Sequence, residues 1–408
     1  MFNILVGQSG GPTAVINASL YGVIDEGMNS SKVDVVYGMN NGIEGFLSDK
    51  IYNISKYLQK ESIDLLKSTP ASFLGSCRYR LPENLDSEIY TQIFKKLEGY
   101  DIKAFIYIGG NDSMDTVSKL SKYAKKIGSD ICFIGVPKTI DNDLLITDHT
   151  PGYGSTAKHV ATTVREIALD ASVYEYPVVT IVELMGRNAG WVTAASVLAR
   201  TAYDDNPMLI YLPEVAFEVD KFVNDVKQAL ENNNSVIVCV SEGISLADGT
   251  LVCEMGNDVG TDTFGHKMLT GCGKVLENVI KEEIGCKCRS IEVNLLQRCS
   301  AVLASKVDID EAEMVGRFGL QQAINGYTGQ MIAIRRIEKD YKTDCILVDV
   351  DDICNKEKKF PKQWIINNGT DISKEFLDYV LPLIQGENTV KFENGLPVYL
   401  KPVYFDEI

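Results

Sequence analysis

Residues 131–143 read Ile-Cys-Phe-Ile-Gly-Val-Pro-Lys-Thr-Ile-Asp-Asn-Asp, an apolar run followed at once by a polar turn. The run Ile131–Val136 has the length and composition of a buried strand. Comparable runs recur at Ile4–Val6, Lys103–Ile108, Val178–Glu183 and Ser235–Val240. Because helix-like stretches lie between these runs, the pattern predicts an α/β fold with parallel sheets that carry helices on both faces.

Two of the intervening stretches have clear helix signals. Thr13–Glu26 follows a proline that suits a first helical turn, and Asp115–Ile127 is amphipathic. Gly128 is expected to cap the second helix, because glycine readily adopts the left-handed conformation that ends helices. The 408-residue chain is long enough for two or more domains with their own cores.

Charge and cysteine content narrow the class of protein. The net charge of −16 argues against a nucleic-acid or anionic-membrane partner. The N-terminus lacks the pattern of a signal peptide, and no apolar run reaches membrane-spanning length. The ten cysteines lack the dense spacing of a disulfide scaffold. We therefore expect a cytoplasmic protein with reduced thiols.

The turn Pro137–Asp143 combines a lysine, a threonine and two aspartates. Phosphoryl transfer needs these groups: a base for an acceptor hydroxyl, a cation for phosphate charge and a carboxylate near a metal. An Asx-rich turn without chemistry is the alternative. That alternative gives no reason for Lys138 and Thr139 beside the aspartates.

Two further strand ends carry paired glycines. Gly7–Pro12 follows the first strand, and Gly109–Ser113 follows the strand at Lys103–Ile108. Paired glycines before a helix let the backbone approach an anion such as phosphate. Either segment could also be a tight turn, with Asp112 or Ser113 as a helix cap. Ligands of open parallel sheets gather at the carboxyl ends of strands, so we expect these loops to converge.

Another strand end, Glu183–Trp191, places Arg187 between two glycines. An arginine there can clamp a sugar phosphate through paired hydrogen bonds. A surface arginine at a helix start is the structural alternative.

Together these motifs resemble the phosphofructokinase family over residues 1 to about 340. The matching segments occur in the family's order: Ser9–Gly11, Phe73–Arg78, Gly109–Ser113, Pro137–Asp143, Met185–Arg187, Val240–Glu242 and Leu296–Arg298. The resemblance implies two similar Rossmann-like three-layer domains with mainly parallel sheets and an active site in the interdomain cleft. It implies a phosphoryl-donor domain from 1–146 plus about 303–360. A fructose 6-phosphate domain would comprise about 147–302 plus about 361–408.

The resemblance also implies residue roles. Asp141 would be the general base for the 1-hydroxyl of fructose 6-phosphate, with Thr139 and Ile140 beside it, and Asp143 would lie near Mg²⁺ with Asn111. The implied donor-binding residues are Gly11, Arg78, Gly110, Asp112 and Lys138. The implied sugar-phosphate residues are Met185, Gly186, Arg187, Glu242, Arg298 and, across a subunit interface, Arg289. A homodimer or homotetramer follows from the last of these.

Asp112 and Lys138 indicate the phosphoryl donor, because ATP-dependent bacterial relatives carry glycine at both positions. An aspartate in the nucleotide cleft would repel the α-phosphate of ATP, whereas a lysine would stabilise a departing phosphate. The expected reaction is a reversible, Mg²⁺-dependent transfer from pyrophosphate to fructose 6-phosphate. Its products are fructose 1,6-bisphosphate and phosphate, and it would serve glycolysis and gluconeogenesis.

Alternatives and departures from the family pattern remain at this point. The chain could instead be an ATP-dependent 6-phosphofructokinase, or a non-catalytic regulatory subunit. Asn111 replaces a metal-binding aspartate of many relatives, and Leu295 and Val178 replace a histidine and an arginine of bacterial ATP-dependent relatives. Asp112 and Lys138 could also pair with each other in the free protein.

Overall fold

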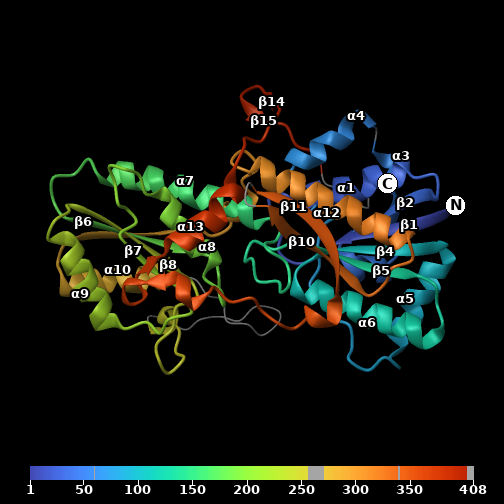
Figure 1. Ribbon diagram of the computed structural model, residues 1–408, viewed down its shortest axis with the longest axis horizontal. Helices are drawn as coiled ribbons and strands as arrows, with labels where there is room; N and C mark the ends of the chain where they lie inside the picture. The colour runs from blue at the N-terminus through green and yellow to red at the C-terminus, as the bar shows by residue number, and fades with distance from the viewer. Residues whose placement is uncertain (59, 256–270, 339–340, 402–408) are drawn as a thin grey trace. The chain divides into compact units, whose positions relative to one another are not determined.

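The computed structural model describes residues 1–58, 60–255, 271–338 and 341–401, which fall into two compact units (Figure 1). Unit 1 comprises the described parts of 1–155, 298–357 and 385–408, and unit 2 those of 156–297 and 358–384. The sequence-based division differs mainly at the end of the chain, since it placed all of 361–408 in the second domain. Hydrogen bonds explain the difference: Ser305 Oγ donates to the Gln385 carbonyl at 3.0 Å, and Leu400 N donates to Thr69 Oγ1 at 3.0 Å.

Unit 1 is built on a seven-stranded sheet with the order β11-β10-β5-β4-β1-β2-β3. The five inner strands run parallel, and β3 and β11 pair antiparallel at the two edges. The strands are β1 Phe2–Gln8, β2 Val33–Met39, β3 Ile51–Asn53, β4 Ile102–Gly109, β5 Cys132–Pro137, β10 Gln330–Glu338 and β11 Lys342–Asp349.

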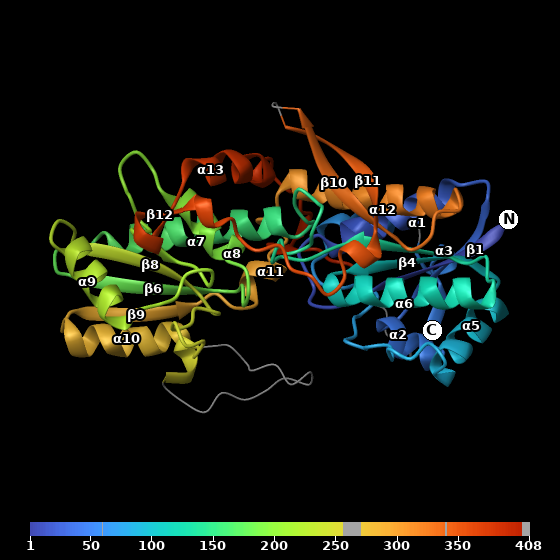
Figure 2. The same ribbon diagram turned by 60° about the horizontal axis from the view of Figure 1, so that its bottom comes forward.

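The central strands of unit 1 are apolar along their whole length because both faces of the sheet are covered. Successive side chains point to opposite faces, so Ile4 and Val6 join one core cluster while Leu5 between them joins another. The first cluster packs against α1 (Ile16–Asn29) and α12 (Lys306–Ile324), and the second against α5 (Glu88–Gly99) and α6 (Asn111–Ile127). Figure 2 shows these two helix pairs on opposite faces of the sheet. This covering accounts for the expected three-layer arrangement.

The helices of unit 1 include one unusually close pair. A side chain on Gly22 of α1 would lie 2.2 Å from the Glu313 carbonyl of α12, and one on Gly316 would lie 2.1 Å from the Ser19 carbonyl. The bare glycines therefore let the two backbones touch. The helices are α1 Ile16–Asn29, α2 Gly42–Leu47, α3 Ile54–Tyr57, α4 Lys60–Ile63, α5 Glu88–Gly99, α6 Asn111–Ile127 and α12 Lys306–Ile324, with 3-10 turns at Asp64–Ser68 and Val350–Asp352 and a hairpin of β14 Phe392–Glu393 and β15 Leu396–Pro397.

Unit 2 contains a four-stranded, fully parallel sheet with the order β7-β8-β6-β9. The strands are β6 Val178–Leu184, β7 Leu209–Tyr211, β8 Ser235–Ser241 and β9 Lys287–Glu292. One face of this sheet packs against α9 and α10, and the other lies under α7 and α8 (Figure 2).

The helices of unit 2 are shorter on average. They are α8 Trp191–Ala194, α9 Val219–Leu230, α10 Cys272–Glu283 and α13 Lys374–Val380, with 3-10 turns at Ala195–Ala199, Val252–Met255, Lys362–Trp364, Asn367–Gly369 and Leu381–Ile384 and a small ladder of β12 Ile365–Ile366 and β13 Asp371–Ile372. Two helices begin in one unit and end in the other: α7 Tyr153–Ala171 and α11 Leu296–Cys299.

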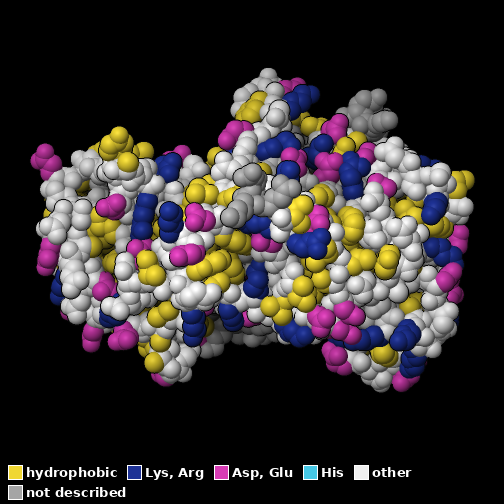
Figure 3. Space-filling model, in the orientation of Figure 1, with side chains coloured by type: hydrophobic (Ala, Val, Ile, Leu, Met, Phe, Trp, Pro, Cys, Tyr) yellow, Lys and Arg dark blue, Asp and Glu magenta, His cyan; other side chains and the backbone are white. Residues whose placement is uncertain are grey.

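The predicted fold class is confirmed, and all five predicted strands are present as β1, β4, β5, β6 and β8. Helix α6 ends as expected, with Gly128 in the left-handed conformation at φ +70°. None of the described helices combines the length and apolar character needed to cross a membrane. On the face in Figure 3, basic and acidic side chains are interspersed, so the described residues there form no extended basic surface.

Candidate active site

The glycine loop after β1 lies against the loop that carries Arg78. Gly10, at φ +77°, donates its N–H to the Cys77 carbonyl at 3.2 Å, and Ser76 Oγ donates to the Gly10 carbonyl at 2.6 Å. The end of β4 approaches the same loop, because Ser9 N donates to the Ile108 carbonyl at 2.9 Å. The structure thus brings the expected donor loops together at one edge of the unit 1 sheet, as strand-end geometry predicts.

Lys138 is the central cation of this group. Its side chain is only 3% exposed, and its Nζ donates to the Gly11 carbonyl at 2.6 Å. Burial lowers the pKa of Lys138 to about 8, although Asp141 and Asp143 favour the charged form. The Arg298 guanidinium disfavours that charge, and Arg78 acts in the same direction. Buried lysines whose pKa is shifted by burial and by nearby acidic and basic groups are common in active sites.

Arg298 belongs to unit 1 and lies beside the glycine loop that follows β1. A side chain on Gly11 would meet Arg298 Nη1 at 3.0 Å, so this arginine reaches the glycine loop because position 11 is bare. Gly110 is similarly close to the lysine turn, since a side chain there would lie 3.5 Å from the Lys138 carbonyl. The sugar-phosphate role expected for Arg298 remains a prediction.

Asp112 pairs with a residue that sequence reasoning missed. Arg80 Nη2 lies 3.2 Å from Asp112 Oδ1, and both side chains are largely exposed. Lys138 bonds instead to Gly11, so the structure differs from the suggested pairing of Asp112 with Lys138. Arg80 lies two residues after Arg78, and this position was the one feature of the sequence that could have indicated a role for it at the site. An exposed pair of this kind contributes little stability, about 0–1 kcal/mol, so it orients the carboxylate rather than holding the fold.

Asn111 begins α6 and is engaged on both sides of its amide. Its Nδ2 donates to the Lys356 carbonyl, and its Oδ1 accepts from Asn355 N at 2.5 Å. The backbone at Asn355 and Lys356 is therefore attached to the loop Gly109–Ser113. In the described part of the chain, no three His, Cys, Asp or Glu side chains group as a metal site. Because an Mg²⁺ ion often takes one or two carboxylates plus substrate oxygens, Asp143 alone is compatible with one.

The turn after β5 has a defined internal geometry. Asp141 N donates to Thr139 Oγ1 at 3.1 Å, so the threonine hydroxyl keeps its proton available for another acceptor. Lys138 N donates to the Gly109 carbonyl at 3.0 Å and ties the turn to the end of β4. Ile140 is buried, whereas Asp141 and Asp143 are partly exposed. The carboxylates can therefore meet a substrate while the backbone beneath them is fixed.

In unit 2, the expected sugar residues gather at the ends of β6 and β8. Gly186, at φ +129°, donates its N–H to Glu242 Oε1 at 3.2 Å, and its carbonyl accepts from Ser241 Oγ. Gly243 packs directly on Arg187, since a side chain at 243 would lie 1.8 Å from the Arg187 carbonyl. Met185, Gly186, Arg187 and Glu242 thus form one cluster, and the sugar-phosphate role expected for them stays a prediction.

Two supporting residues of this cluster were not predicted. Met185 N donates to Gln297 Oε1 at 3.3 Å, and Gln297 is 2% exposed. Glu183, also buried, accepts the N–H groups of Gly271 and Gly273 at 3.1 and 2.7 Å and so caps α10. The position of Gln297 beside Arg298 was the only sequence signal for the first.

Arg289 lies apart from that cluster within unit 2, on β9. Its Nη1 is 3.7 Å from Asp170 Oδ2, and its guanidinium lies 6.0 Å from the Tyr174 ring. It lines a surface pocket of about 260 Å³ beneath α7 together with residues such as Thr163, Glu166 and Thr180. Val178, where bacterial relatives carry an arginine, is fully buried in β6.

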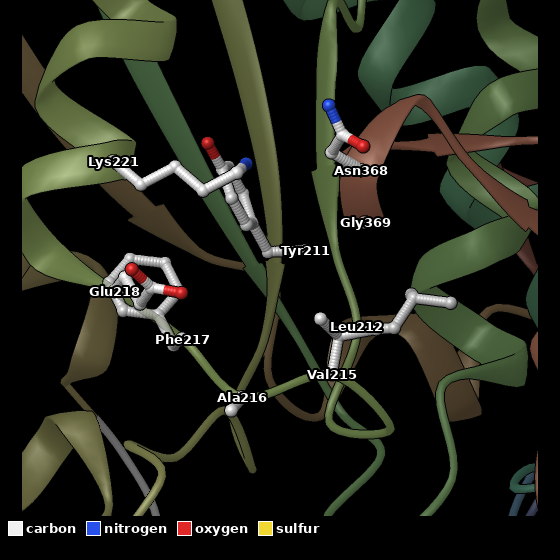
Figure 4. Close-up of a pocket in the computed structure, with 9 residues that line it drawn as sticks. All are labelled: Tyr211, Leu212, Val215, Ala216, Phe217, Glu218, Lys221, Asn368 and Gly369. Atoms are coloured by element: carbon white, nitrogen blue, oxygen red, sulfur yellow. The ribbon is translucent and has the colours of Figure 1, made fainter.

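A smaller pocket, of about 70 Å³, lies beside β7 and is shown in Figure 4. It contains none of the predicted site residues. Two of its polar side chains are already paired, because Tyr211 Oη and Lys221 Nζ donate to Asp225 Oδ2 at 2.8 and 2.7 Å. We therefore do not assign the chemistry to this pocket.

Comparison with known proteins shows which family the chain matches. The family model described as "Phosphofructokinase" matches residues 3–312. The chain is 39% identical over 404 residues to the pyrophosphate–fructose 6-phosphate 1-phosphotransferase of Halomonas elongata, covering 98% of this chain and 96% of that protein. It is 40% identical over 403 residues to the enzyme of the same name from Xanthomonas campestris, covering 98% and 95%.

A solved structure gives the same result. The crystal structure of a pyrophosphate-dependent phosphofructokinase from Nitrosospira multiformis superposes with a TM-score of 0.89 at 34% identity, covering 98% of this chain and 97% of that one. The family expected from the motifs is thereby confirmed: the chain belongs to the phosphofructokinase family.

Proposed function

We propose that this protein is a pyrophosphate-dependent 6-phosphofructokinase, which transfers a phosphoryl group reversibly from pyrophosphate to the 1-hydroxyl of fructose 6-phosphate. One observation carries the donor assignment: the side-chain nitrogen of buried Lys138 donates to the Gly11 carbonyl, and ATP-dependent bacterial relatives carry glycine in place of this lysine. The relatives from Halomonas elongata and Xanthomonas campestris carry this activity in their names.

Lys138 acts on the leaving phosphate. As the bond to the transferring phosphoryl group breaks, negative charge grows on the departing oxygens, and a fixed cation in a desolvated site stabilises that charge. Arg78 and Arg298 add positive charge close by, and the bare backbones of Gly11 and Gly110 let pyrophosphate approach.

Asp112 selects against ATP. Its carboxylate stands in the first turn of α6, where Arg80 holds one oxygen at 3.2 Å. A nucleotide would bring its α-phosphate towards this carboxylate, and the repulsion disfavours ATP, whereas pyrophosphate has no such group.

Asp141 acts as the general base on the acceptor. It removes the proton from the 1-hydroxyl as that oxygen attacks the phosphoryl group. Thr139 accepts the Asp141 N–H and can donate its own proton to the substrate, which orients the hydroxyl beside the base. Ile140 lies buried between them and fixes their spacing.

Mg²⁺ fits this chain chiefly through Asp143. When bound, the ion would neutralise charge on the pyrophosphate oxygens, and water would fill its remaining positions. The amide oxygen of Asn111 already accepts a hydrogen bond from Asn355 N. It could bind the metal only through its remaining lone pair. The metal therefore depends mainly on one protein carboxylate and on the substrate.

Unit 2 binds the sugar phosphate in this proposal. Met185, Gly186, Arg187 and Glu242 form one cluster, in which the hydrogen bond from Gly186 N orients the Glu242 carboxylate. Arg289 serves a neighbouring subunit, which requires at least a homodimer. In the single chain Arg289 is partly exposed and lies beside Asp170. A sugar phosphate bound to a second subunit could replace Asp170 as its partner. None of the ten cysteines, all of which lie in described parts of the chain, forms a disulfide bond, as suits a cytoplasmic enzyme.

A donor assay tests the proposal. Purified protein with Mg²⁺ and fructose 6-phosphate should turn over with pyrophosphate and not measurably with ATP. Turnover with ATP and none with pyrophosphate would support the ATP-dependent alternative. Asp141→Asn should remove turnover while leaving the thermal midpoint nearly unchanged, which also tests the regulatory-subunit alternative.

A further inference from the structure

The catalytic turn does not hold its shape alone. The chain doubles back after it, and we call Thr147–Gly152 the return segment. Thr139 N donates to the Pro151 carbonyl at 3.2 Å, and Thr150 Oγ1 donates to the Thr139 carbonyl at 3.2 Å. Thr150 N also donates to the Asn142 side chain at 3.1 Å, and Asn142 is fully buried at φ +53°. The geometry at Thr139–Asp143 therefore depends on where the return segment lies.

Helix α12 fixes one end of the return segment through Asp308. The Asp308 carboxylate accepts Gly152 N at 2.9 Å and Ser155 N at 2.8 Å, and the side chain is 2% exposed. A carboxylate from another helix thereby caps the first turn of α7.

Glu311, one turn further along α12, holds the middle of the return segment through His149. Glu311 Oε2 lies 2.6 Å from His149 Nε2, and Asp148 Oδ1 lies 2.9 Å from His149 Nδ1. His149 is 1% exposed. Because each ring nitrogen faces a carboxylate oxygen, both nitrogens must donate, and the ring is an imidazolium. Burial alone would lower the pKa of His149, but Glu311 and Asp148 raise it to about 9.

Groups on β10, on β11 and at Tyr341, directly before β11, complete this cluster. Tyr341 Oη and Thr343 Oγ1 donate to Glu311 Oε1 at 2.8 and 2.9 Å, and Arg336 Nη2 donates to Asp148 Oδ1 at 3.0 Å. Burial raises the pKa of the nearby Cys345 thiol to about 12, so that group stays neutral. The carboxylates of Asp148 and Glu311 are thus balanced by the cations of His149 and Arg336. This pairing allows all four groups to stay charged although they are partly or fully buried.

From this geometry we propose that His149, clamped by Glu311 and flanked by the Asp308 cap, is a positioning residue for catalysis. It touches no substrate, yet it sets the return segment and, through Thr150, the turn that carries Asp141. The inference rests on the proposed role of Asp141 as base. It predicts that loss of the clamp lowers turnover more than it lowers sugar binding, because Arg187 and Glu242 belong to unit 2.

The test compares His149→Gln and Glu311→Gln with the double variant. We expect kcat with pyrophosphate to fall about 10- to 100-fold, since a displacement of roughly 1 Å costs about that much. KM for fructose 6-phosphate should change less than about threefold. The double variant should fall little further than either single variant, because one interaction is removed in each case. His159→Gln on α7 is the matched control and should leave kcat unchanged.

A second readout does not need activity. The chain has three histidines, so imidazole NMR signals can be assigned with the variants. The His149 signal should remain that of the protonated ring at pH 7.5 in the wild-type protein and should titrate near 9. In Glu311→Gln its midpoint should move down by at least one pH unit. A wild-type midpoint near 6.5 would overturn the clamp whatever the enzyme does.

If His149→Gln does not fold, Thr150→Val provides the same test, because it removes the hydroxyl that joins the return segment to Thr139. We expect a 3- to 10-fold loss of kcat with an unchanged KM. A folded variant at either position with kcat within twofold of wild type would overturn the proposal. Wild-type protein without pyrophosphate turnover would instead overturn the proposed function, and the two failures are distinguishable.

Discussion

Replacing Lys138 with methionine should remove most of the activity and leave the protein, at neutral pH, no less stable. Burial lowers the pKa of Lys138 from 10.5 to about 8. That difference of about 2.5 units means that the charged lysine destabilises the folded state by about 3 kcal/mol at pH 7. Methionine removes this cost but leaves the Gly11 carbonyl without its donor, which costs about 1–3 kcal/mol. Lys138→Met should therefore be as stable as wild type or up to about 2 kcal/mol more stable.

The pH dependence gives a cleaner measurement. Between pH 8 and 10.5 the unfolded chain still holds the Lys138 proton, whereas the folded protein has lost it. Lys138 therefore makes the free energy of unfolding of the wild-type protein rise with pH in this range. Lys138→Met lacks that gain. The stability of the variant relative to wild type should therefore fall by up to about 3 kcal/mol between pH 7 and 10.5. The hydrogen bond from Lys138 to the Gly11 carbonyl does not affect this change with pH, because the variant lacks that bond at both pH values.

Urea unfolding of both proteins at several pH values, with matched ionic strength, measures the difference. In parallel, kcat/KM for pyrophosphate should fall about 10²- to 10³-fold, as when one fixed donor is removed from a developing anion. Wild-type kcat/KM for pyrophosphate should decline above about pH 8 as Lys138 loses its proton. A relative stability that does not change with pH would refute a buried, proton-shifted Lys138.

Three further outcomes are expected. Gly316→Ala should destabilise unit 1 by about 2 kcal/mol or more in urea unfolding, because the new methyl group would lie 2.1 Å from the Ser19 carbonyl, whereas Gly99→Ala, with open space around it, should be neutral. Asp112→Gly combined with Lys138→Gly should lose pyrophosphate activity and gain measurable ATP turnover; unchanged pyrophosphate kinetics would show that these positions do not select the donor. EDTA should abolish turnover and added Mg²⁺ should restore it, with little change in the thermal midpoint, since few protein groups hold the ion.

The sequence predicted the fold best where burial is continuous. Strands such as β4 and β5 carry apolar side chains on both faces, so a run of residues was enough to place them. The edge strands β3 and β7 have three residues each, and β11 is mostly half-exposed, so their patterns are weak. Pattern length and two-sided burial, rather than strand propensity, separated the two groups.

The candidate site was predictable where one loop contains several functional groups. The turn Pro137–Asp143 is such a loop, and its composition alone pointed to phosphoryl transfer. Contacts between distant residues were not predictable: Arg80 pairs with Asp112, and Asn111 bonds to the backbone of Asn355, 244 residues away. Nothing in the local pattern of either segment reports such a partner.

The position of α12 in the chain has a consequence for protein synthesis. His149 precedes Glu311 by 162 residues, and the four strands of the main unit 2 sheet, β6 to β9, are translated between them. At roughly 5–20 residues per second, the catalytic turn leaves the ribosome about 10–30 s before the helix that shapes it. A nascent or truncated chain that ends before residue 306 contains the glycine loops and the turn Pro137–Asp143. It lacks α12, whose Asp308 and Glu311 hold the return segment in place. Such a chain should remain catalytically silent until translation is almost complete.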